Sequence, residues 1–598
     1  MQSLKRRYKY LQMLSLLFVS VLLLLMPFFL NTYYVRLLQL IGIYVLLATG
    51  LNLVTGYTGQ VSLGHGGLYG IGAYTSALLA TKLGLSFWVA LPLSILVAAV
   101  FGVILGFPSL RIRGPYLAMV TIGFGIIIEK IMVEWTGLTG GPIGIMGIPT
   151  PQIGKFLFTG NRMYFLILFL VGIGLVVAHN LINSKWGRAF VAIRENEIAA
   201  GAMGINVREF KVIAFTLSAA YAGAAGSLYS HLSGYISPDS FTFNFSIFSL
   251  LLIVVGGMGT IVGPVIGAAV LTFLPEVLHG FDKYRLLIYG VLLIISVLAM
   301  QEGIVGLIKR KISSNDMPQD SNQYLPEKKT LKVGFLKTVR RNFNGSILEL
   351  VNVSKSFGGL TAVNRLNMKV VEGTIHSLIG PNGAGKSTVI NLISGFYRPT
   401  SGEIKFKGRV VSVFETHIQA KSGIARTFQN VQLYQKASVL DNVLVGMHLR
   451  INEGFWGTCL KLPAVRRSEN LARQEAMALL RFLGLERYAE MPAEKLPYGH
   501  QKLLEIARAL ALQPDLLLLD EPAAGLNETE VVELAKIITQ IKEKGVTVLL
   551  VEHQMNLVME ISDYITVIDY GKKIAEGPPE VIQNDQTVIQ AYLGTEVA

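Results

Sequence analysis

Acidic residues are missing from a long part of this chain, and cysteine is nearly absent from all of it. The first aspartate or glutamate is Glu129, and Cys459 is the single cysteine among 598 residues. One cysteine excludes an internal disulfide, so the polar part gives no sign of an oxidising compartment. A stretch of 128 residues without a carboxylate side chain excludes an ordinary soluble domain at the N-terminal end.

Long apolar runs fill the part of the chain that lacks acidic residues. They recur at lengths sufficient to cross about 30 Å of hydrocarbon, which predicts a polytopic membrane domain. The first run resembles a signal peptide, but it is longer than a usual apolar core of one and lacks a small-x-small cleavage site, so we interpret it as a span. The candidate spans are residues 11–30, 35–54, 61–81, 87–107, 116–133, 163–182, 210–229, 246–274 and 286–301.

The net charge of +14 comes largely from basic clusters beside the apolar runs. This placement favours membrane topology over nucleic-acid binding, because lysine and arginine stay on the cytoplasmic side of a bilayer. If the N-terminus is inside, six crossings return the chain to the cytosol at loop 183–209, which is itself basic. The clusters are Lys5, Arg6, Arg7 and Lys9, then Arg111 and Arg113, then Lys185, Arg188, Arg194, Arg208 and Lys211.

Glycines interrupt one apolar run at the point where the topology needs an extra crossing. A single span over 246–274 would leave the C-terminal half of the chain outside the cell. Gly256, Gly257, Gly259 and Gly263 lie inside this run and allow two short segments or a re-entrant one. We therefore predict a break there, and such breaks line a protein-enclosed pathway because their free backbone groups cannot face lipid.

A second glycine-dense stretch, residues 56–65, has the same character. For each glycine taken alone, close helix packing through small residues is the favoured explanation. His65 is expected to be a hydrogen-bonded packing residue and not a proton carrier.

The composition divides the chain into three parts. Residues 1–308 form the membrane domain, residues 309–346 form a linker too polar to bury, and residues 347–598 form a soluble domain in which short apolar strands alternate with amphipathic helices. The expected fold class is a polytopic α-helical membrane domain followed by an α/β P-loop NTPase domain.

The soluble domain contains a complete phosphate-binding P-loop. The glycines let backbone N–H groups wrap a phosphate, the lysine adds a positive charge, and the serine hydroxyl can ligate Mg²⁺. The predicted ATP-binding residues of the loop are Gly380, Pro381, Asn382, Gly383, Ala384, Gly385, Lys386, Ser387 and Thr388.

Two adjacent carboxylates follow an apolar strand predicted over residues 516–519. Asp520 is expected to hold Mg²⁺, and Glu521 is expected to orient or polarise the water that attacks the γ-phosphate. A helix start would also explain an Asp-Glu-Pro sequence, but it would not explain the P-loop upstream. The pair therefore predicts nucleotide hydrolysis.

With these motifs in the expected order, residues 347–598 resemble an ATP-binding-cassette (ABC) domain. The resemblance implies that Phe357 stacks on adenine, that Gln429 touches Mg²⁺ together with Ser387 and Asp520, and that His553 contacts the γ-phosphate. Glu521, His553 and Gln429 are then the expected catalytic residues, with ATP and Mg²⁺ as cofactors.

The signature segment departs from the family pattern. Tyr498, Gly499, His500 and Gln501 match the segment that contacts ATP bound to a partner cassette, but Pro497 stands where the family has a serine hydroxyl. Gly499 keeps a close backbone approach, and the helix predicted over residues 502–512 still offers a positive dipole end. Asn527 replaces the usual aspartate of the next loop and can still form hydrogen bonds.

A narrower resemblance covers both halves. The glycine stretch 56–65, the Thr139-Gly140-Gly141-Pro142 loop and the break at 256–259 are similar to permeases of bacterial branched-chain amino-acid importers. Residues 522–527 and 591–594 look like the cassette of the same system. The resemblance implies a coupling loop on the cytoplasmic side, which Glu197, Ala199, Ala200 and Gly204 match.

The expected function is ATP-driven import of branched-chain amino acids delivered by a periplasmic binding protein. Import of urea or short amides is the alternative on the same architecture, and an ATP-dependent exporter or regulator is a third. In the ABC arrangement, ATP lies between the P-loop of one cassette and the signature of another, and this chain has one of each. The resemblance therefore implies a second permease and a second ATP-binding subunit, or a second copy of the chain. The expected location is the bacterial inner membrane, with the ATPase domain in the cytoplasm.

Overall fold

The computed structural model describes residues 20–110, 114–277, 303–307 and 345–593, with a few isolated positions between them. The chain divides into two compact units. The first comprises Met1–Ile182 and Arg208–Ser321, and the second comprises Asn183–Val207 and Asn322–Ala598. Part of the first predicted span, most of the last one and most of the predicted linker lie outside the described residues.

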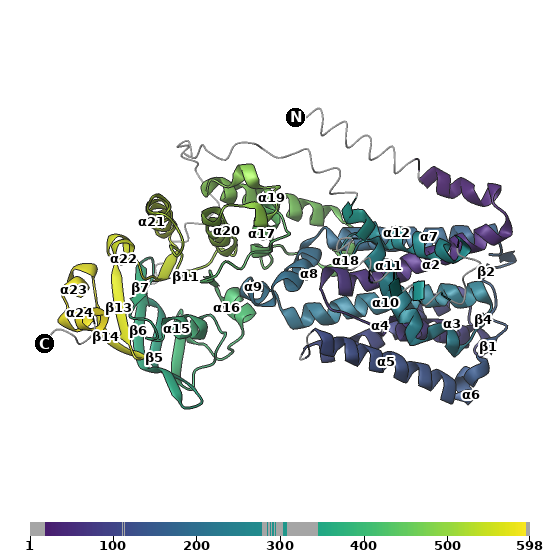
Figure 1. The fold of residues 1–598 in the computed structure, drawn as a ribbon, viewed down its shortest axis with the longest axis horizontal. Helices are drawn as coiled ribbons and strands as arrows, with labels where there is room; N and C mark the ends of the chain where they lie inside the picture. The colour runs from purple at the N-terminus through teal and green to yellow at the C-terminus, as the bar shows by residue number, and fades with distance from the viewer. Residues whose placement is uncertain are drawn as a thin grey trace. The chain divides into compact units, whose positions relative to one another are not determined.

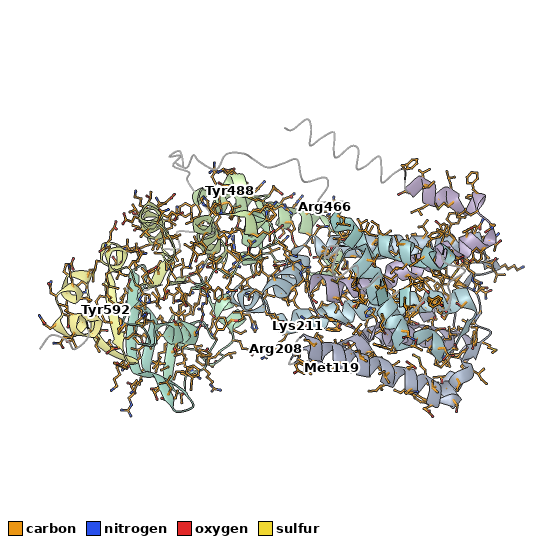
Figure 2. All side chains as sticks on the ribbon, viewed as in Figure 1. Met119, Arg208, Lys211, Arg466, Tyr488 and Tyr592 are labelled. Atoms are coloured by element: carbon orange, nitrogen blue, oxygen red, sulfur yellow. The ribbon has the colours of Figure 1, made fainter. Side chains whose placement is uncertain are left out.

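The first unit is a bundle of apolar helices that run alongside one another (Figure 1). Six described helical stretches are long and apolar enough to cross a membrane. Arg208 and Lys211, which the charge argument placed on the cytoplasmic side, lie in the first turns of α10 (Figure 2). The main helices are α2 (Thr32–Leu51), α3 (His65–Thr81), α4 (Phe87–Gly106), α5 (Pro115–Glu134), α7 (Asn161–Ile182), α10 (Val207–Ser233), α11 (Phe243–Gly256) and α12 (Gly263–Val277).

The predicted glycine break is confirmed. The apolar run 246–274 forms two helices, α11 and α12, and the turn between them includes Gly257 and Gly259 with φ of +129° and +71°. The two helices meet at glycines, since a Cβ on Gly256 would lie 1.9 Å from the carbonyl oxygen of Gly263. Only glycine permits both the backbone conformation and this approach.

The second glycine-dense stretch is also a backbone break. Helix α2 ends in a π-helical turn, η1 (Asn52–Tyr57), and residues 59–64 are not helical. The predicted span 61–81 is therefore a helix only from His65, because Gly59 adopts a φ of +69° and the chain changes direction before α3. The N–H of Leu63 is satisfied by the Thr121 hydroxyl at 2.9 Å.

Short elements connect the ends of the membrane helices. The segment after α5 contains α6 (Thr136–Thr139), η3 (Gly141–Ile143) and β1 (Ile145–Met146). Strand β1 pairs with β4 (Tyr235–Ile236), which follows α10. Strands β2 (Gln152–Ile153) and β3 (Phe156–Leu157) form a separate hairpin, and η2 (Pro108–Leu110) and η4 (Pro238–Phe241) are single 3₁₀ turns.

The second unit contains two sheets. The four-stranded antiparallel sheet has the order β6-β5-β8-β9, and the six-stranded sheet has the order β10-β11-β12-β7-β13-β14, parallel except for its last pair. The parallel strands are buried on both faces, which explains their unbroken apolar sequences. The bounds are β5 (Ser346–Phe357), β6 (Leu360–Val371), β7 (Ile375–Ile379), β8 (Ser401–Phe406), β9 (Arg409–Val410), β10 (Ile424–Arg426), β11 (Leu516–Asp520), β12 (Thr547–Val551), β13 (Tyr564–Asp569) and β14 (Lys572–Gly577).

Helices surround the parallel sheet, and one apolar core joins several of them. Buried side chains of α17, α19, α20 and α21 pack together with those of β11 and β12. The bounds are α15 (Lys386–Ile393), α16 (Thr416–Ser422), α17 (Val439–Gly446), α18 (Phe455–Cys459), η6 (Glu486–Tyr488), α19 (Pro463–Phe482), η7 (Ala493–Lys495), α20 (Tyr498–Leu510), α21 (Glu528–Glu543), α22 (Met555–Ile561), α23 (Pro579–Gln583) and α24 (Gln586–Leu593).

The loop between α7 and α10 belongs to the second unit. It forms α8 (Lys185–Glu195) and α9 (Glu197–Ala202), which share Asn196 as the C-cap of one helix and the N-cap of the other. The Asn196 side chain accepts a hydrogen bond from the N–H of Ala199, a typical N-cap contact. No linker separates the two helices, so they are joined closely.

Candidate functional site

The P-loop connects buried strand β7 to helix α15. Gly380 and Gly385 pack so closely that an added Cβ would lie 2.0 Å from the Ile568 carbonyl oxygen and 2.4 Å from that of Ala362. Gly385 has a φ of +103° and serves as the N-cap of α15. The loop thus presents backbone N–H groups at the positive end of a helix, the arrangement that binds phosphate.

Lys386 and Ser387 are the first two residues of α15. The Lys386 ammonium donates to the carbonyl oxygens of Gly380 at 2.7 Å and Pro381 at 3.0 Å, so it folds back over the loop. Burial lowers the pKa of Lys386, while Glu521 and Asp520 act in the opposite direction. The cation is therefore held beside the loop and beside the two carboxylates.

The three predicted catalytic side chains meet at Glu521. One carboxylate oxygen lies 3.1 Å from His553 Nε2, and the other accepts a hydrogen bond from Gln429 Nε2 at 3.0 Å. Glu521 follows β11 with a φ of +48°, a conformation that L residues rarely adopt. Such backbone strain persists where the surrounding structure fixes it, and here it directs the carboxylate toward Gln429 and His553.

Asp520 lies at the end of β11 and is buried. Its Oδ2 pairs with the Arg426 guanidinium at 3.3 Å, whereas its Oδ1 has no hydrogen-bond partner among the described residues. Burial raises the pKa of Asp520, and Arg426 opposes that shift. A buried carboxylate oxygen without a partner suits a cation ligand, so the residues present fit Mg²⁺.

Two buried residues near this cluster were missed by the sequence reasoning. The Lys502 ammonium donates to the backbone oxygens of Gln429 at 2.9 Å and Glu521 at 3.3 Å. The Glu552 carboxylate accepts from the N–H groups of Ala523 at 2.6 Å and His553 at 2.9 Å. Lys502 follows the predicted residue Gln501, and Glu552 precedes the predicted residue His553. A charged residue beside a motif does not by itself predict a role in the site.

Phe357 ends strand β5 and has 42% of its surface exposed. Its ring meets that of Tyr397 edge-on at 5.1 Å, and the Lys355 ammonium lies 5.0 Å from its centre. The ring is accessible to a base, so adenine stacking stays a prediction for it. Burial raises the pKa of Tyr592 on α24 (Figure 2), and a hydrogen bond with the backbone of Gly380 in the P-loop opposes that shift.

The signature segment forms the first turn of α20. Pro497 is the N-cap, so the helix begins at Tyr498, four residues before the predicted start, and has no side-chain cap. The prediction missed this because a proline before a tyrosine and a glycine favours a turn, whereas here its fixed φ leads into the helix. Tyr498 packs over Gly525, where an added Cβ would lie 3.0 Å from its ring.

Gly499 and Asn527 lie on either side of Glu530. A Cβ on Gly499 would lie 2.6 Å from a Glu530 carboxylate oxygen. Asn527 is the N-cap of α21 and forms a complete capping box with Glu530. The asparagine therefore has a local structural role in this position, which explains why it can replace an aspartate.

The predicted coupling residues lie on and just after α9. Ala199 and Ala200 are fully buried. A Cβ on Gly201 would lie 2.6 Å from the Thr416 hydroxyl of α16, and one on Gly204 would lie 2.5 Å from Leu449. The Asn196 amide also donates to the Gln432 side chain, three residues after Gln429. Small side chains thus allow this loop to dock closely against the domain that holds the P-loop.

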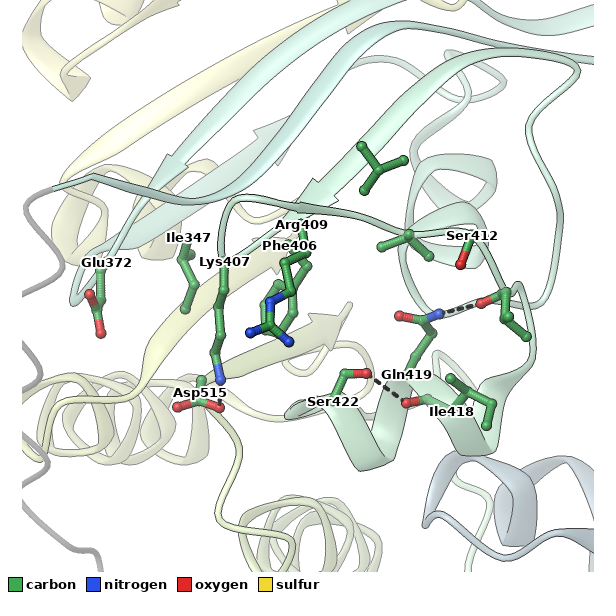
Figure 3. A pocket seen from close by; sticks show the side chains of 13 residues that line it. Ile347, Glu372, Phe406, Lys407, Arg409, Ser412, Ile418, Gln419, Ser422 and Asp515 are labelled. Atoms are coloured by element: carbon green, nitrogen blue, oxygen red, sulfur yellow. Dashed lines mark hydrogen bonds and ion pairs between the residues drawn. The ribbon is translucent and has the colours of Figure 1, made fainter.

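A separate pocket of about 590 Å³ lies between α16 and the hairpin of β8 and β9 (Figure 3). Lys407 and Asp515 form an ion pair at its wall, and Gln419 donates to the Val413 carbonyl oxygen at 2.7 Å. Its lining contains none of the predicted site residues. It shares α16 with the docking contact of α9 but is distinct from the P-loop site.

The strand-loop-helix geometry, the carboxylate cluster and the signature helix define the second unit as an ABC cassette. Residues 363–524 match the family described as "ABC transporter". Residues 33–297 match "Branched-chain amino acid transport system / permease component", and residues 572–598 match "Branched-chain amino acid ATP-binding cassette transporter".

Curated relatives cover each half separately. The ATP-binding protein BraF of Pseudomonas aeruginosa is 47% identical over 249 residues, which is 42% of this chain and 98% of BraF. LivG of Escherichia coli is 43% identical over the same lengths. The permease LivM of Escherichia coli is 38% identical over 325 residues, 50% of this chain and 76% of LivM. This chain belongs to the branched-chain amino-acid family of ABC transporters and carries its permease and its ATP-binding domain together.

The crystal structure of a nucleotide-free ATP-binding cassette from an ABC transporter is 32% identical to this chain. It covers 42% of this chain and 99% of its own length, with a TM-score of 0.37.

Proposed function

We propose that this chain is the permease and ATPase subunit of an importer of branched-chain amino acids. The single observation that carries the proposal is that one chain resembles LivM over its membrane half and BraF and LivG over nearly their full length, all of which are named for branched-chain amino-acid transport. The ABC cassette supplies ATP hydrolysis. Leucine, isoleucine and valine are the proposed substrates.

ATP would bind along the P-loop with its adenine against Phe357. Glu521 would act on the water that attacks the γ-phosphate, because its carboxylate is held between His553 and Gln429. His553, which lies at the Glu521 oxygen not bound by Gln429, would contact the γ-phosphate. The cluster thus positions one base and two polar groups around the reacting phosphate.

Ser387, Gln429 and Asp520 would hold Mg²⁺, which neutralises charge on the phosphate oxygens during transfer. Asp520 is suited to this because its second oxygen, Oδ2, is already fixed by Arg426. Lys502 would maintain the distance between the Gln429 loop and the Glu521 turn, since its ammonium bonds to both backbones.

The chain carries half of each of two nucleotide sites. Tyr498, Gly499, His500 and Gln501 would face ATP bound to a partner cassette, with N–H groups of the first turn of α20 toward the phosphate. Pro497 contributes no hydroxyl, so this contact would depend on the backbone. The partner would be a second permease and ATP-binding subunit of the same importer, or a second copy of this chain.

Closure of the two cassettes would act on the permease through Glu197, Ala199, Ala200 and Gly204 of the coupling loop. The proposed direction is inward, with substrate delivered by a periplasmic binding protein at the outer loops. The chain would lie in the bacterial inner membrane with its cassette in the cytoplasm, as the basic loop 183–209 favours.

The test is uptake into proteoliposomes that contain the full chain, the subunits that copurify with it and the cognate binding protein. We expect ATP-dependent accumulation of radiolabelled leucine and no comparable accumulation of urea. The Glu521→Gln variant serves as the control for ATP dependence. Accumulation of urea alone, or efflux of preloaded leucine, would contradict the proposal.

A further inference from the structure

Helix α8, which precedes the coupling loop, makes its own set of contacts with the cassette. Arg188 forms a two-pronged ion pair with Glu469 of α19, at 3.0 Å and 2.8 Å. The two side chains are only 9% and 14% exposed. Paired guanidinium and carboxylate groups in this geometry are directional as well as strong, so the pair fixes the position of α8 along α19.

Further contacts continue along the first turn of α8. The Lys185 ammonium donates to the Ile451 carbonyl oxygen at 2.7 Å. The Trp186 ring meets the Phe455 ring edge-on at 5.5 Å. Both partners belong to the segment 451–462 between α17 and α19. We call Lys185 and Arg188, with Ile451, Glu453 and Glu469, the α8 clamp.

Glu453 lies in the middle of this cluster and is 4% exposed. Neither carboxylate oxygen makes a hydrogen bond of normal geometry within the described chain, although the Ser468 hydroxyl is close. Burial and Glu469 raise the pKa of Glu453 to about 7, while Arg188, Lys185 and Ser468 lower it. His448 is also near, and burial with the two cations lowers its pKa to about 3. Two cations of α8 therefore face two carboxylates of the cassette.

The α8 clamp and the α9 contact end on different parts of the cassette. Helix α9 meets α16 and Gln432, close to Gln429. The α8 clamp meets α19, whose buried residues Ala472, Ala476 and Leu480 share one apolar core with Leu504 and Ile506 of the signature helix α20. One loop thus contacts both the Gln429 region and the helices that carry the signature.

We propose that Arg188 and Lys185 form a second transmission contact, through which movement of the signature-bearing helices reaches the permease separately from α9. Arg188 is a positioning residue, because it touches neither nucleotide nor substrate and acts through Glu469. It operates within the transport cycle proposed above and rests on that cycle. Because α8 and α9 follow one another directly at Asn196, the two contacts act on the same loop.

Charge reversal tests the pair in the full chain with its copurifying subunits in proteoliposomes. Arg188→Glu and Glu469→Arg are each expected to lower leucine uptake per ATP hydrolysed by about tenfold, because a broken buried pair leaves an uncompensated charge. Combining the two reversals should restore at least part of the ratio. Arg481 lies on the same helix as Glu469 and forms an exposed ion pair with Glu486. Arg481→Glu is therefore the matched control and should leave the ratio unchanged.

Rescue by the double reversal separates transmission from simple loss of folding. Single variants that keep the wild-type ratio, or a double variant that transports no better than the singles, would overturn the proposal. If the single variants do not assemble, the double variant still decides the result.

A second readout does not depend on the substrate. Trp186→Cys and Phe455→Cys, whose rings lie 5.5 Å apart in the wild type, are combined in a Cys459→Ser background that keeps Arg188 and Glu469. The two new cysteines are expected to be linked by a short cleavable bismaleimide in the assembled full chain. Absence of linking would show that α8 does not dock on the cassette beside α19 and would overturn the proposal. A wild-type chain that links normally but imports no leucine would refute the proposed function and leave the docking contact standing.

Discussion

The two kinds of glycine-rich segment in this chain treat their backbone groups in opposite ways. In the P-loop, the N–H groups of Asn382, Gly383 and Gly385 form no hydrogen bonds with other described residues, which leaves them for phosphate. In the membrane unit, side chains satisfy the breaks: Asn52 Oδ1 accepts from the Gly259 N–H at 2.8 Å, and Asn52 Nδ2 donates to the Thr260 carbonyl oxygen at 2.8 Å.

The solvent explains this difference. Water can satisfy a P-loop before nucleotide arrives, whereas a backbone break at membrane depth must find its partners within the protein. Asn52 lies on η1 and bonds to the turn between α11 and α12, so one carboxamide joins the two breaks. A glycine-rich segment therefore forms a ligand-binding loop in the cassette. In the membrane unit it forms a junction whose backbone groups are bonded by a side chain.

The largest expected effect falls on the ligand-binding side of this comparison. Glu521→Gln should lower ATP turnover by about 100-fold or more, since it removes the base while keeping the hydrogen-bonding shape. The measurement is phosphate release by the purified full chain with its copurifying subunits. Glu528→Gln, an exposed residue in the first turn of α21, is the control and should be near wild type. Wild-type turnover in the first variant would remove Glu521 from its assigned role.

Lys502→Met is expected to have the next largest effect, about tenfold on ATP turnover. Its ammonium ties the backbone of Gln429 to that of Glu521, and methionine would leave two buried carbonyl oxygens without this donor. Nucleotide affinity should change less than turnover, because Lys502 bonds to neither Lys386 nor the P-loop. The exposed Lys495→Met variant controls for loss of a nearby charge. Equal losses in both variants would argue against the structural tie.

Asn52→Leu tests the membrane side of the comparison. It should lower leucine uptake about tenfold with ATP hydrolysis largely kept, since it leaves the Gly259 N–H and the Thr260 oxygen unpaired at a cost of about 1–3 kcal/mol each. Asn161→Leu is a matched control, because the Asn161 amide donates to the Pro27 carbonyl oxygen at 3.1 Å, away from the breaks. Normal uptake by the Asn52 variant would show that the junction is not part of the transport path.

The sequence predicted features that depend on local patterns. The P-loop, the strand before Asp520 and the break inside 246–274 follow from glycine spacing and apolar runs, and the structure places them where expected. It could not predict the partners of those features. Nothing in the sequence links Asn52 to Gly259, more than 200 positions away, or Lys502 to Gln429, because such pairs are set by tertiary packing. The α8 clamp was missed for the same reason: Arg188 was interpreted only as a topological charge.

The smallest expected effect is a pH dependence at the α8 clamp. Because the folded-state pKa of Glu453 is about 7, above its ordinary 4.5, protonation favours the buried state. Its stabilising contribution is complete below about pH 4.5 and is lost as the pH rises through 7. The Tm of the full chain should therefore fall between pH 6 and pH 8 by a few degrees more than that of Glu453→Gln, since about 1 kcal/mol shifts the Tm of a domain of this size by about 2–4 °C. The exposed Glu490→Gln variant should follow the wild type. If the Tm of the wild type and of Glu453→Gln changed with pH in parallel, the cations of α8 would be keeping the Glu453 carboxylate ionised. The α8 clamp would then be no more sensitive to pH than the α9 contact.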